Sequence, residues 1–467
     1  MRGVDAPARV HDLLERYDRP GPRYTSYPTA VEFHAGVGDE TYRARLAEAD
    51  TASASPLSVY MHLPFCEDRC TYCGCNVIIT RHREVAAHYL DYLDRELDLL
   101  ASCLPRRRTV SQLHWGGGTP TYHAPAELER IGERFLRHFT LTPDGEAGVE
   151  IDPRVTSAEQ LASLRQLGFN RLSLGVQDFT PEVQEAVRRV QSFELTRDAI
   201  ETGRALGFAS VNIDLIYGLP YQHAAGFERT LERVISLRPD RVAVYSFAFV
   251  PWIRAHMKHL PQESLPPAGV KLELLAIAIE SFTAAGYRQI GMDHFALPDD
   301  ELARAVDSRA LHRNFMGYTV QAAGDTVALG VSGIGDVRGV FVQNTKKLSE
   351  YYAALDAGRF PIERGYTLDD DDMVRRHVIT ELMCNAHLDI HDVERRFGIS
   401  FGDYFAPELA KLTGPSSPAA DGLVTVSDRV IEATDTGRLF IRNVCMVFDR
   451  YLQARSLGAQ PVFSRTV

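Results

Sequence analysis

Residues 58–76 read SVYMHLPFCEDRCTYCGCN, a short β-rich run that ends in a cluster of cysteines. Similar runs return along the chain with amphipathic helical stretches between them, at 111–118, 147–153, 171–178, 211–220 and 241–251. Strands that alternate with helices indicate βα units and a parallel sheet. The spacing therefore predicts an α/β fold, a partial (β/α) barrel of about six parallel βα units.

Polar and glycine residues gather at the C-terminal ends of these runs, as in Gly116–Gly118, Glu150, Gln177 and Asp214. Barrel enzymes carry their chemistry at this end of the strands. A doubly wound open sheet would also bind ligands at strand ends, but only near one switch point. Polar residues at the ends of six strands favour the barrel.

The barrel lies between two other parts of the chain. Residues 1–55 form an N-terminal arm, in which RPGPRYTSYPTA (19–30) is rich in proline and is expected to be extended. Residues 56–365 are assigned to the barrel and a following insertion, with further β-like runs at 287–295 and 326–335.

Residues 366–467 form a third part with a different pattern. Helical segments precede a hairpin-like stretch and one final helix over 438–453, which predicts a small, mostly helical, winged-helix-like domain. The acidic run Asp369–Asp372 is expected to start a helix, where negative charge is favourable, and not to bind a metal.

Charge and hydropathy exclude several classes of protein. The chain carries a net charge of −11, and its C-terminal part has 11 Lys and Arg against 15 Asp and Glu, so nucleic-acid binding is not expected. No apolar run of roughly 18 residues is present, so no membrane span is expected. We expect a cytoplasmic protein, and a monomer.

The cysteines carry the most specific signal. Cys66, Cys70 and Cys73 have the spacing C-x3-C-x2-C, and Cys75 follows two residues later. Thiolates hold the iron of Fe–S clusters, and three on one loop leave a fourth iron open to chelate S-adenosylmethionine. The alternative is structural zinc, although zinc knuckles use two separated cysteine pairs. Motif and barrel pattern together resemble the radical S-adenosylmethionine (SAM) superfamily.

Longer motifs resemble one family within it. GPRYTSYPTA, HWGGGTPTY, NRLSLGVQDF, NIDLIYGLP, GMDHFA, HRNFMGYT and IRNVCMVFD are similar to those of oxygen-independent coproporphyrinogen III oxidases over nearly the whole chain. The resemblance implies conversion of two propionate groups of coproporphyrinogen III to vinyls, giving protoporphyrinogen IX in anaerobic haem biosynthesis. It also implies one [4Fe-4S] cluster with an open iron, two SAM molecules, and a reduced donor such as flavodoxin or ferredoxin.

The resemblance further implies roles for individual residues. The cluster ligands would be Cys66, Cys70 and Cys73, and Cys75 would have a nearby role without being a ligand. Tyr60 and Glu150 would be catalytic. The first SAM molecule would be lined by Tyr60, Tyr72, Gly117, Glu150 and Ile334. The second would be lined by Gly118, Thr119, Gln177, Arg189, Asp214 and Ala248.

Some assignments remain open. Arg188 stands next to Arg189 and could share its role. Arg23 is a candidate for the cationic entrance that a tetracarboxylate substrate requires, and we hypothesise that the arm folds over the barrel mouth. The rival function is a haem-binding chaperone of the same superfamily.

Overall fold

The computed structural model describes residues 12–14, 16–52, 55–321, 324–454 and 463–466. Its main feature is a 12-stranded sheet. In spatial order the strands are β16 (Ile362–Thr367), β15 (Val340–Asn344), β14 (Ile334–Val337), β13 (Thr326–Leu329), β1 (Leu57–Leu63), β4 (Thr109–Gly117), β5 (Thr140–Ile151), β6 (Arg171–Gln177), β7 (Ser210–Tyr217), β8 (Arg241–Ser246), β10 (His294–Ala296) and β9 (Arg288–Gly291).

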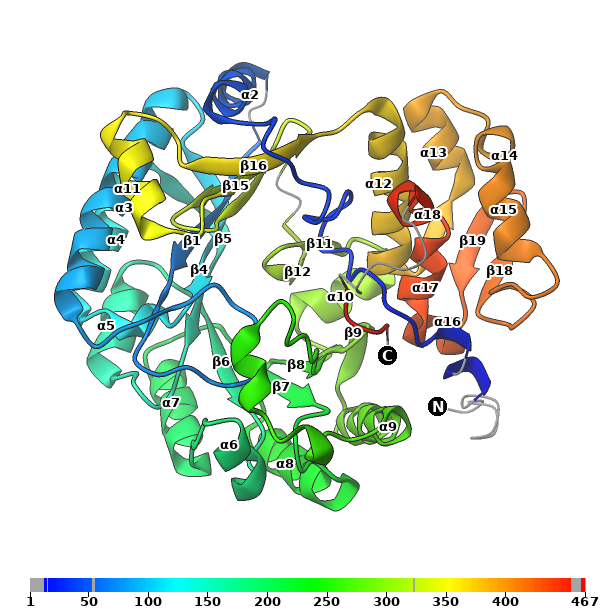
Figure 1. The fold of residues 1–467 in the computed structure, drawn as a ribbon, viewed down its shortest axis with the longest axis horizontal. Coiled ribbons are helices and arrows are strands. Elements are labelled where there is room, and N and C mark those ends of the chain that lie inside the picture. Colours follow the sequence, from blue (N-terminus) through cyan, green and yellow to red (C-terminus); the bar gives the residue numbers. More distant parts are fainter. Residues whose placement is uncertain (1–11, 15, 53–54, 322–323, 455–462, 467) are drawn as a thin grey trace.

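The six β-rich runs of the sequence are confirmed as β1, β4, β5, β6, β7 and β8, which are neighbours in this order and pair in parallel. Strands β14 to β16 at one end, and β10 and β9 at the other, pair antiparallel. The sheet curves without pairing β16 to β9 among the described residues, so it is a barrel with one open side (Figure 1).

Helices form an arc outside the parallel strands (Figure 1). Their apolar side chains recur every three or four residues, which turns one face toward the sheet. In α4, for example, Leu128, Ile131 and Phe135 are buried. The helices of the arc are α3 (Arg83–Cys103), α4 (Pro125–His138), α5 (Ala158–Gln166), α6 (Pro181–Ala186), α7 (Phe193–Ala205), α8 (Ala224–Leu237) and α9 (Ala268–Ala284).

The two later β-like runs are each split in two. Residues 287–295 turn back at Met292, whose φ of 35° is left-handed, so that β9 and β10 form a hairpin on β8. Residues 326–335 are divided by a turn at Gly330–Gly333 into β13 and β14. Strand β13 pairs in parallel with β1, which adds a seventh parallel strand to the predicted six.

The chain after residue 366 has a hydrophobic core of its own. It contains α12 (Asp370–Asn385), α13 (Ile390–Phe397), α14 (Phe401–Tyr404) and α15 (Ala406–Thr413), with a small sheet of β17 (His387–Asp389), β19 (Val430–Ala433) and β18 (Val424–Val426). We call this part the C-terminal lobe. Its helices and β-hairpin agree with the winged-helix-like pattern expected from the sequence.

The prediction of one final helix over 438–453 is wrong. The segment forms α16 (Asp435–Leu439), α17 (Ile441–Met446) and α18 (Arg450–Ala454) instead. The backbone leaves helical geometry at Phe440, with φ −108° and ψ 18°. Gly437 lies so close to the Leu423 carbonyl oxygen that a Cβ would be 1.8 Å from it, so tertiary contact fixes the path here.

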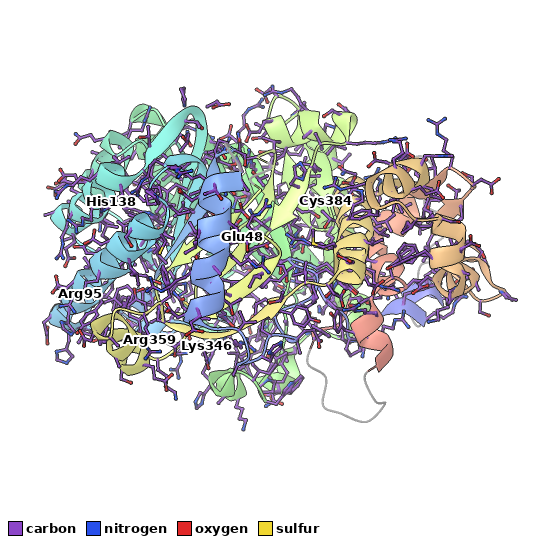
Figure 2. All side chains as sticks on the ribbon, turned by 90° about the horizontal axis from the view of Figure 1, so that it is seen from above. Glu48, Arg95, His138, Lys346, Arg359 and Cys384 are labelled. Atoms are coloured by element: carbon purple, nitrogen blue, oxygen red, sulfur yellow. The ribbon has the colours of Figure 1, made fainter. Side chains whose placement is uncertain are left out.

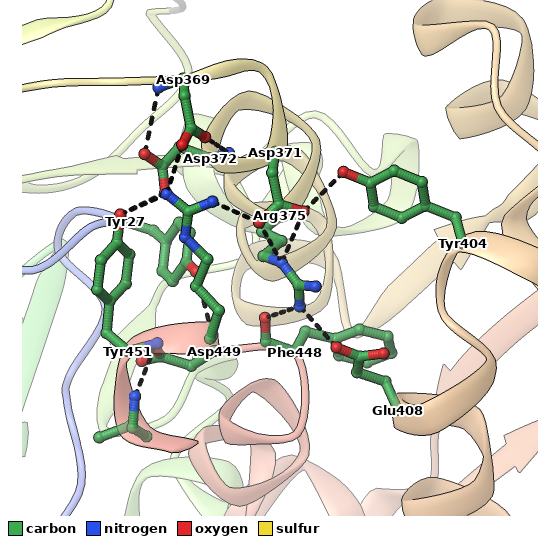
Figure 3. Close-up of polar contacts among 12 residues, drawn as sticks. Tyr27, Asp369, Asp371, Asp372, Arg375, Tyr404, Glu408, Phe448, Asp449 and Tyr451 are labelled. Atoms are coloured by element: carbon green, nitrogen blue, oxygen red, sulfur yellow. Dashed lines mark hydrogen bonds and ion pairs between the residues drawn. The ribbon is translucent and has the colours of Figure 1, made fainter. Parts of the chain in front are cut away.

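The acidic run begins α12, as predicted. The Asp369 side chain accepts the N–H of Asp372, and the Asp372 side chain accepts the N–H of Asp369 (Figure 3). Arg450 binds the carboxylates of Asp369 and Asp371 at 2.7 Å each, and Arg375 joins Asp371 to another part of the lobe. The run therefore caps a helix and ties the last helix to it.

The N-terminal arm crosses the open side of the barrel, between the sheet and the C-terminal lobe (Figure 1). It ends in α2 (Asp39–Ala52), which packs on β14 and β15 and carries Glu48 on its outer side (Figure 2). Tyr24 and Tyr27 of the arm are buried in the core of the lobe. Within the described ranges, no helix combines the length and apolar character needed to cross a membrane.

Candidate active site

A cavity of about 440 Å³ opens at the C-terminal ends of the parallel strands. Consecutive strands each contribute side chains to its wall, as expected for a barrel enzyme. The lining includes Cys66, Cys70, Tyr72, Cys73, Cys75, Gly117, Gly118, Thr119, Glu150, Asp152, Arg154, Ser173, Gly175, Gln177, Arg189, Asp214 and Tyr245. Most of the residues singled out from the sequence therefore meet in one place.

The cysteine loop is closed at its base by a short parallel pairing of β2 (Phe65–Cys66) with β3 (Ile78–Ile79). Within it, the N–H of Cys73 donates to the Cys70 carbonyl at 3.2 Å. The N–H of Thr71 donates to the Val187 carbonyl at 3.1 Å, which holds the loop against the end of α6. These bonds give the loop a fixed shape with its thiols on the cavity side.

The thiols have distinct electrostatic surroundings. Arg154 Nη2 and Arg189 Nη1 lie 3.8 and 3.9 Å from Cys70 Sγ. Burial raises the pKa of Cys66 to about 11. A hydrogen bond from the Cys75 thiol lowers the pKa of Cys73 to about 6, because it stabilises the thiolate. Two guanidinium groups thus place positive charge beside this loop.

The donor set fits an iron–sulfur cluster better than a single ion. In the part of the chain that the structure describes, no three Cys, His, Asp or Glu side chains converge on a point where one metal ion could sit. Tetrahedral zinc requires that convergence. The thiolates of a cubane each bind a different iron and stand further apart. Three thiols on one cavity wall with arginines behind them suit an anionic cluster.

The glycine triplet brings backbone against Glu150. Gly117 has a φ of +112°, and its N–H donates to Glu150 Oε2 at 3.2 Å. A Cβ on Gly118 would lie 2.5 Å from the Pro64 carbonyl carbon, so only glycine allows this approach. Burial would raise the pKa of Glu150, but the His114 ring at 3.2 Å and the Gly117 N–H lower it overall. Glu150 is therefore a fixed negative charge on the cavity wall.

Arg189 is a buried cation with one unused donor. Its Nη1 lies 3.0 Å from Asp152 Oδ2, and its Nη2 donates to the Gly175 carbonyl at 2.6 Å. Its Nε has no partner among the described residues. A buried N–H without an acceptor is costly, so this position suits a ligand carboxylate. Nearby Gln177 has a left-handed φ of 68°, a strain typical of functional sites.

Comparison with known proteins agrees with this geometry. The radical SAM superfamily matches residues 60–234, and the HemN C-terminal domain matches residues 368–440. The oxygen-independent coproporphyrinogen III oxidase of Pseudomonas aeruginosa is 46% identical over 461 residues, which cover 98% of each protein. That of Escherichia coli is 45% identical over 455 residues, 97% of this chain and 98% of the other. This chain belongs to the oxygen-independent coproporphyrinogen III oxidase family.

A solved structure extends the agreement to three dimensions. Coproporphyrinogen III oxidase (HemN) from Escherichia coli, described as a radical SAM enzyme, matches with a TM-score of 0.89 and 44% identity. The match covers 94% of this chain and 98% of that one. The radical SAM fold is thereby confirmed, and the haem-chaperone alternative is not favoured.

Asp214 lies within β7 and faces the cavity of this family member. It accepts hydrogen bonds from Asn212 Nδ2 at 2.9 Å and Ser173 Oγ at 3.3 Å. Burial outweighs these bonds and raises the pKa of Asp214 to about 6. Asp214 and Glu150 are thus two carboxylates with opposite pKa shifts in one oxidase-family cavity.

Three residues named from the sequence do not line the cavity. Tyr60 is separated from Glu150 by His114. The Tyr60 ring stacks on His114, and the Tyr60 hydroxyl is 3.0 Å from His62 Nδ1. Ala248 follows β8, and Ile334 begins β14, where it pairs with Gln343. Their proposed roles would therefore be indirect, or would require contact beyond this cavity wall.

Two open questions about arginines have structural answers. Arg188 is exposed and has a left-handed φ of 54°, whereas Arg189 is 7% exposed and lines the cavity. Arg23 forms an ion pair with Asp293 at 2.5 Å beside the Tyr245 ring and is absent from the cavity lining. The structure therefore does not place Arg23 at the entrance to this cavity.

From the sequence, Asp152 is expected only as one of the polar residues at the strand ends, without a role, and Arg154, Ser173 and Tyr245 of the cavity lining are missed. Asp152 holds both Arg154 and Arg189, and Ser173 supports Asp214. Tyr245 enters from β8. A signal existed for Ser173, because side chains two apart share a face of a strand and Gly175 and Gln177 follow it. Arg154 carried no such signal, since it lies beyond the end of β5.

Proposed function

We propose that this chain oxidatively decarboxylates two propionate side chains of coproporphyrinogen III to vinyl groups, giving protoporphyrinogen IX in anaerobic haem biosynthesis. The observation that supports it is that the cysteine loop, the glycine triplet, Glu150 and Arg189 meet at one cavity, in a chain that matches an oxidase relative over 98% of each protein. Each conversion removes a hydrogen atom, one carbon dioxide and one further electron from a propionate.

The cofactors of the superfamily are a [4Fe-4S] cluster and SAM. When both are bound, the reduced cluster supplies the electron that splits SAM into methionine and a hydrogen-abstracting 5′-deoxyadenosyl radical. Cys66, Cys70 and Cys73 would hold the cluster through three of its irons. Arg154 and Arg189, beside Cys70, would offset its negative charge.

The first SAM molecule would lie against Tyr72, Gly117 and Glu150. The negative Glu150 suits an ammonium group, and His114 and the Gly117 N–H hold that carboxylate in one orientation. Tyr60 would act through His114, on which its ring stacks. Ile334 would contribute only if the β13–β14 turn moves toward the cavity.

A second SAM molecule would be lined by Gly118, Thr119, Gln177, Arg189 and Asp214, with Ala248 at its edge. Arg189 Nε would donate to its carboxylate, because that donor has no partner among the described residues. Asp214 would accept from ribose hydroxyls. Arg189 is buried and Asp214 is partly buried, so both polar groups are held in place before a ligand binds.

The remaining requirements are an electron donor and a compartment. Reduced flavodoxin or ferredoxin would supply electrons to the cluster, and the protein would act as a monomer. Free cysteines clustered on one loop are typical of the reducing cytoplasm, where we expect this enzyme to work.

An anaerobic assay tests the proposal. Reconstituted protein with dithionite, SAM and coproporphyrinogen III should form protoporphyrinogen and 5′-deoxyadenosine. Cys70→Ala should abolish both products and lower the bound iron, because a lost thiolate cannot be replaced. Cys103→Ala, at the end of α3 and away from the cavity, should keep both. Tight haem uptake without decarboxylation would contradict the proposal.

A further inference from the structure

The cavity end of the barrel carries exposed apolar side chains. Large hydrophobic residues that are more than a third exposed follow β1, β5, β6, β7 and β8, namely Ile79, Val155, Val190, Tyr221, Trp252 and Ile253. Trp252 and Ile253 are 46% and 54% exposed and stand next to each other in the loop after β8. Apolar side chains gathered on one face mark an interaction site.

Positive side chains without ion pairs lie on the same end. Arg69 of the cysteine loop, Arg254 and Lys258 of the loop after β8, and Lys346 after β15 form no ion pair with a described residue. By contrast, Asp68 and Glu67 of the cysteine loop are held by Arg81 and Arg83. This excess of positive charge is local, because the whole chain has a net charge of −11.

Two effects on neighbouring groups join these cations into one surface. The guanidinium groups of Arg69 and Arg254 both lie close enough to Cys73 for their charges to act on its side chain. Partial burial lowers the pKa of Lys346, and Arg364 and Arg254 add to that effect, with the nearby carboxylate of Glu363 opposing it. Arg254 is therefore near both the cysteine loop and Lys346.

This surface is in direct contact with the proposed cluster site. The 3-10 helix η2 (Ala255–His259) packs on the cysteine loop, with His256 Nε2 2.8 Å from the carbonyl oxygen of Cys73. The loop of residues 252–258 therefore contacts the backbone of Cys73, a proposed cluster ligand. An electron entering here would cross little protein.

We propose that this basic–apolar face, made by Arg69, Trp252, Ile253, Arg254, Lys258 and Lys346, docks a small acidic electron-carrier protein that reduces the cluster. The inference rests on the proposed function and names the partner's docking site. Complementary charge speeds the encounter of such proteins and sets their orientation. Electron-transfer complexes use small interfaces, and one exposed Trp–Ile pair ringed by cations suits a brief contact.

The test compares two reductants on the reconstituted holoenzyme. Arg254→Glu/Lys258→Glu should raise the KM for reduced flavodoxin, an acidic probe, by about tenfold or more and flatten its dependence on salt. Turnover with dithionite should stay as in the wild type, because a small reductant needs no docking face. Trp252→Ala should also weaken the flavodoxin reaction, through lost apolar contact without a change of charge.

A matched control reverses two cations at the other end of the barrel. Arg106 and Arg137 precede β4 and β5, and their side chains are 73% and 64% exposed. Arg106→Glu/Arg137→Glu makes the same change in net charge and should leave the reaction with flavodoxin unaltered.

Stopped-flow bleaching of the cluster by reduced flavodoxin gives a readout that needs no turnover. If flavodoxin reduces the cluster of the wild type but no protoporphyrinogen forms, the proposed function fails. The effect of the substitutions on docking can still be read from the bleaching rates. Unchanged bleaching rates in Arg254→Glu/Lys258→Glu would overturn the docking proposal. An equal loss of turnover with dithionite, caused by a higher KM for coproporphyrinogen, would also overturn it. That result would show that these cations bind the tetracarboxylate substrate.

Discussion

Glu150 and Asp214 show how neighbouring side chains set the charge of a carboxylate. Both line the same cavity and are partly buried, yet burial raises the pKa of Asp214 to about 6 while the pKa of Glu150 is lowered. Glu150 receives hydrogen bonds from His114 and a backbone N–H, whereas Asn212 and Ser173 only partly offset the burial of Asp214. Glu150 stays charged at neutral pH, and Asp214 gains a proton under mildly acidic conditions.

Asp214→Asn tests this difference. In the proposed second SAM site, ionised Asp214 would accept from ribose hydroxyls above pH of about 6, and protonation below that pH would make it a weaker acceptor. The KM for SAM in the wild type should therefore rise as pH falls through this range. The Asn variant should have a KM about tenfold higher at pH 7.5, with little further rise in acid. Steady-state assays at pH 5.5 and 7.5 measure both, and an unchanged pH profile in Asp214→Asn would rule out Asp214 as the titrating group.

The cysteines of one motif could be predicted to reach the cavity, as could residues that the family resemblance assigned, among them Glu150, Gln177, Arg189 and Asp214, but several other lining residues could not. Three cysteines in a fixed spacing identify their chemistry without any structure, and the cavity contains all three. Arg154 and Tyr245 reach the cavity from different strands, and neither residue type is unusual at its position in the sequence. Ala248 and Ile334 have no polar group that would show whether their side chains face the cavity, so only the fold could locate them.

Helix α3 links the cysteine loop to the turn before β14. Its buried Glu96 accepts hydrogen bonds at 2.6 Å from the Gly330 N–H, from Asn344 Nδ2 and from the Tyr351 hydroxyl. Two helical turns earlier, the Tyr89 hydroxyl donates to the His62 carbonyl at the end of β1. The helix therefore holds the strand that leads into the cysteines and the turn that leads to Ile334 in one arrangement.

Glu96→Gln tests the energetic cost of this link. Burial raises the pKa of Glu96 to about 7, so the native state keeps a proton that the unfolded chain loses near pH 4.5. The stabilisation from that proton is complete below pH 4.5 and is lost as pH rises through 7. The stability of the wild type relative to Glu96→Gln should fall over this range by on the order of 3 kcal/mol. Melting temperatures at pH 5 and 8 measure it, with exposed Glu48→Gln as control; a constant difference would contradict the assignment.

Elements with a local pattern could be predicted, while those set by distant contacts could not. The six parallel strands follow from apolar runs separated by helices. Strand β13 has only four residues, and its pairing with β1 joins segments far apart in the chain. The final helix had a continuous apolar pattern, but contact of Gly437 with Leu423 and the buried guanidinium of Arg442 fix a broken path.

At the scale of the whole molecule, the arm closes the open side of the barrel by binding both neighbours. Arg23 pairs with Asp293 in the β9–β10 hairpin, and the Tyr24 hydroxyl donates to Asp449 of the C-terminal lobe at 2.9 Å. Arg442 of the lobe donates to the backbone carbonyls of Gly21 and Pro22. The described part of the arm therefore joins the lobe to the barrel.

Asp293→Asn should loosen this junction from the barrel side. The Arg23 guanidinium holds the pKa of Asp293 well below its usual range, so the pair is charged at all working pH values. Removing the carboxylate leaves the partly buried Arg23 without its counter-ion, at a cost of on the order of 2 kcal/mol. We expect faster trypsin cleavage in residues 16–23, and more 5′-deoxyadenosine released per protoporphyrinogen formed, because water and solutes would reach the cavity. Tyr24→Phe, which loses only one hydrogen bond to the lobe, should show a much smaller change. If Asp293→Asn is cleaved faster but keeps the wild-type ratio of the two products, the arm binds the domains together without shielding the reaction.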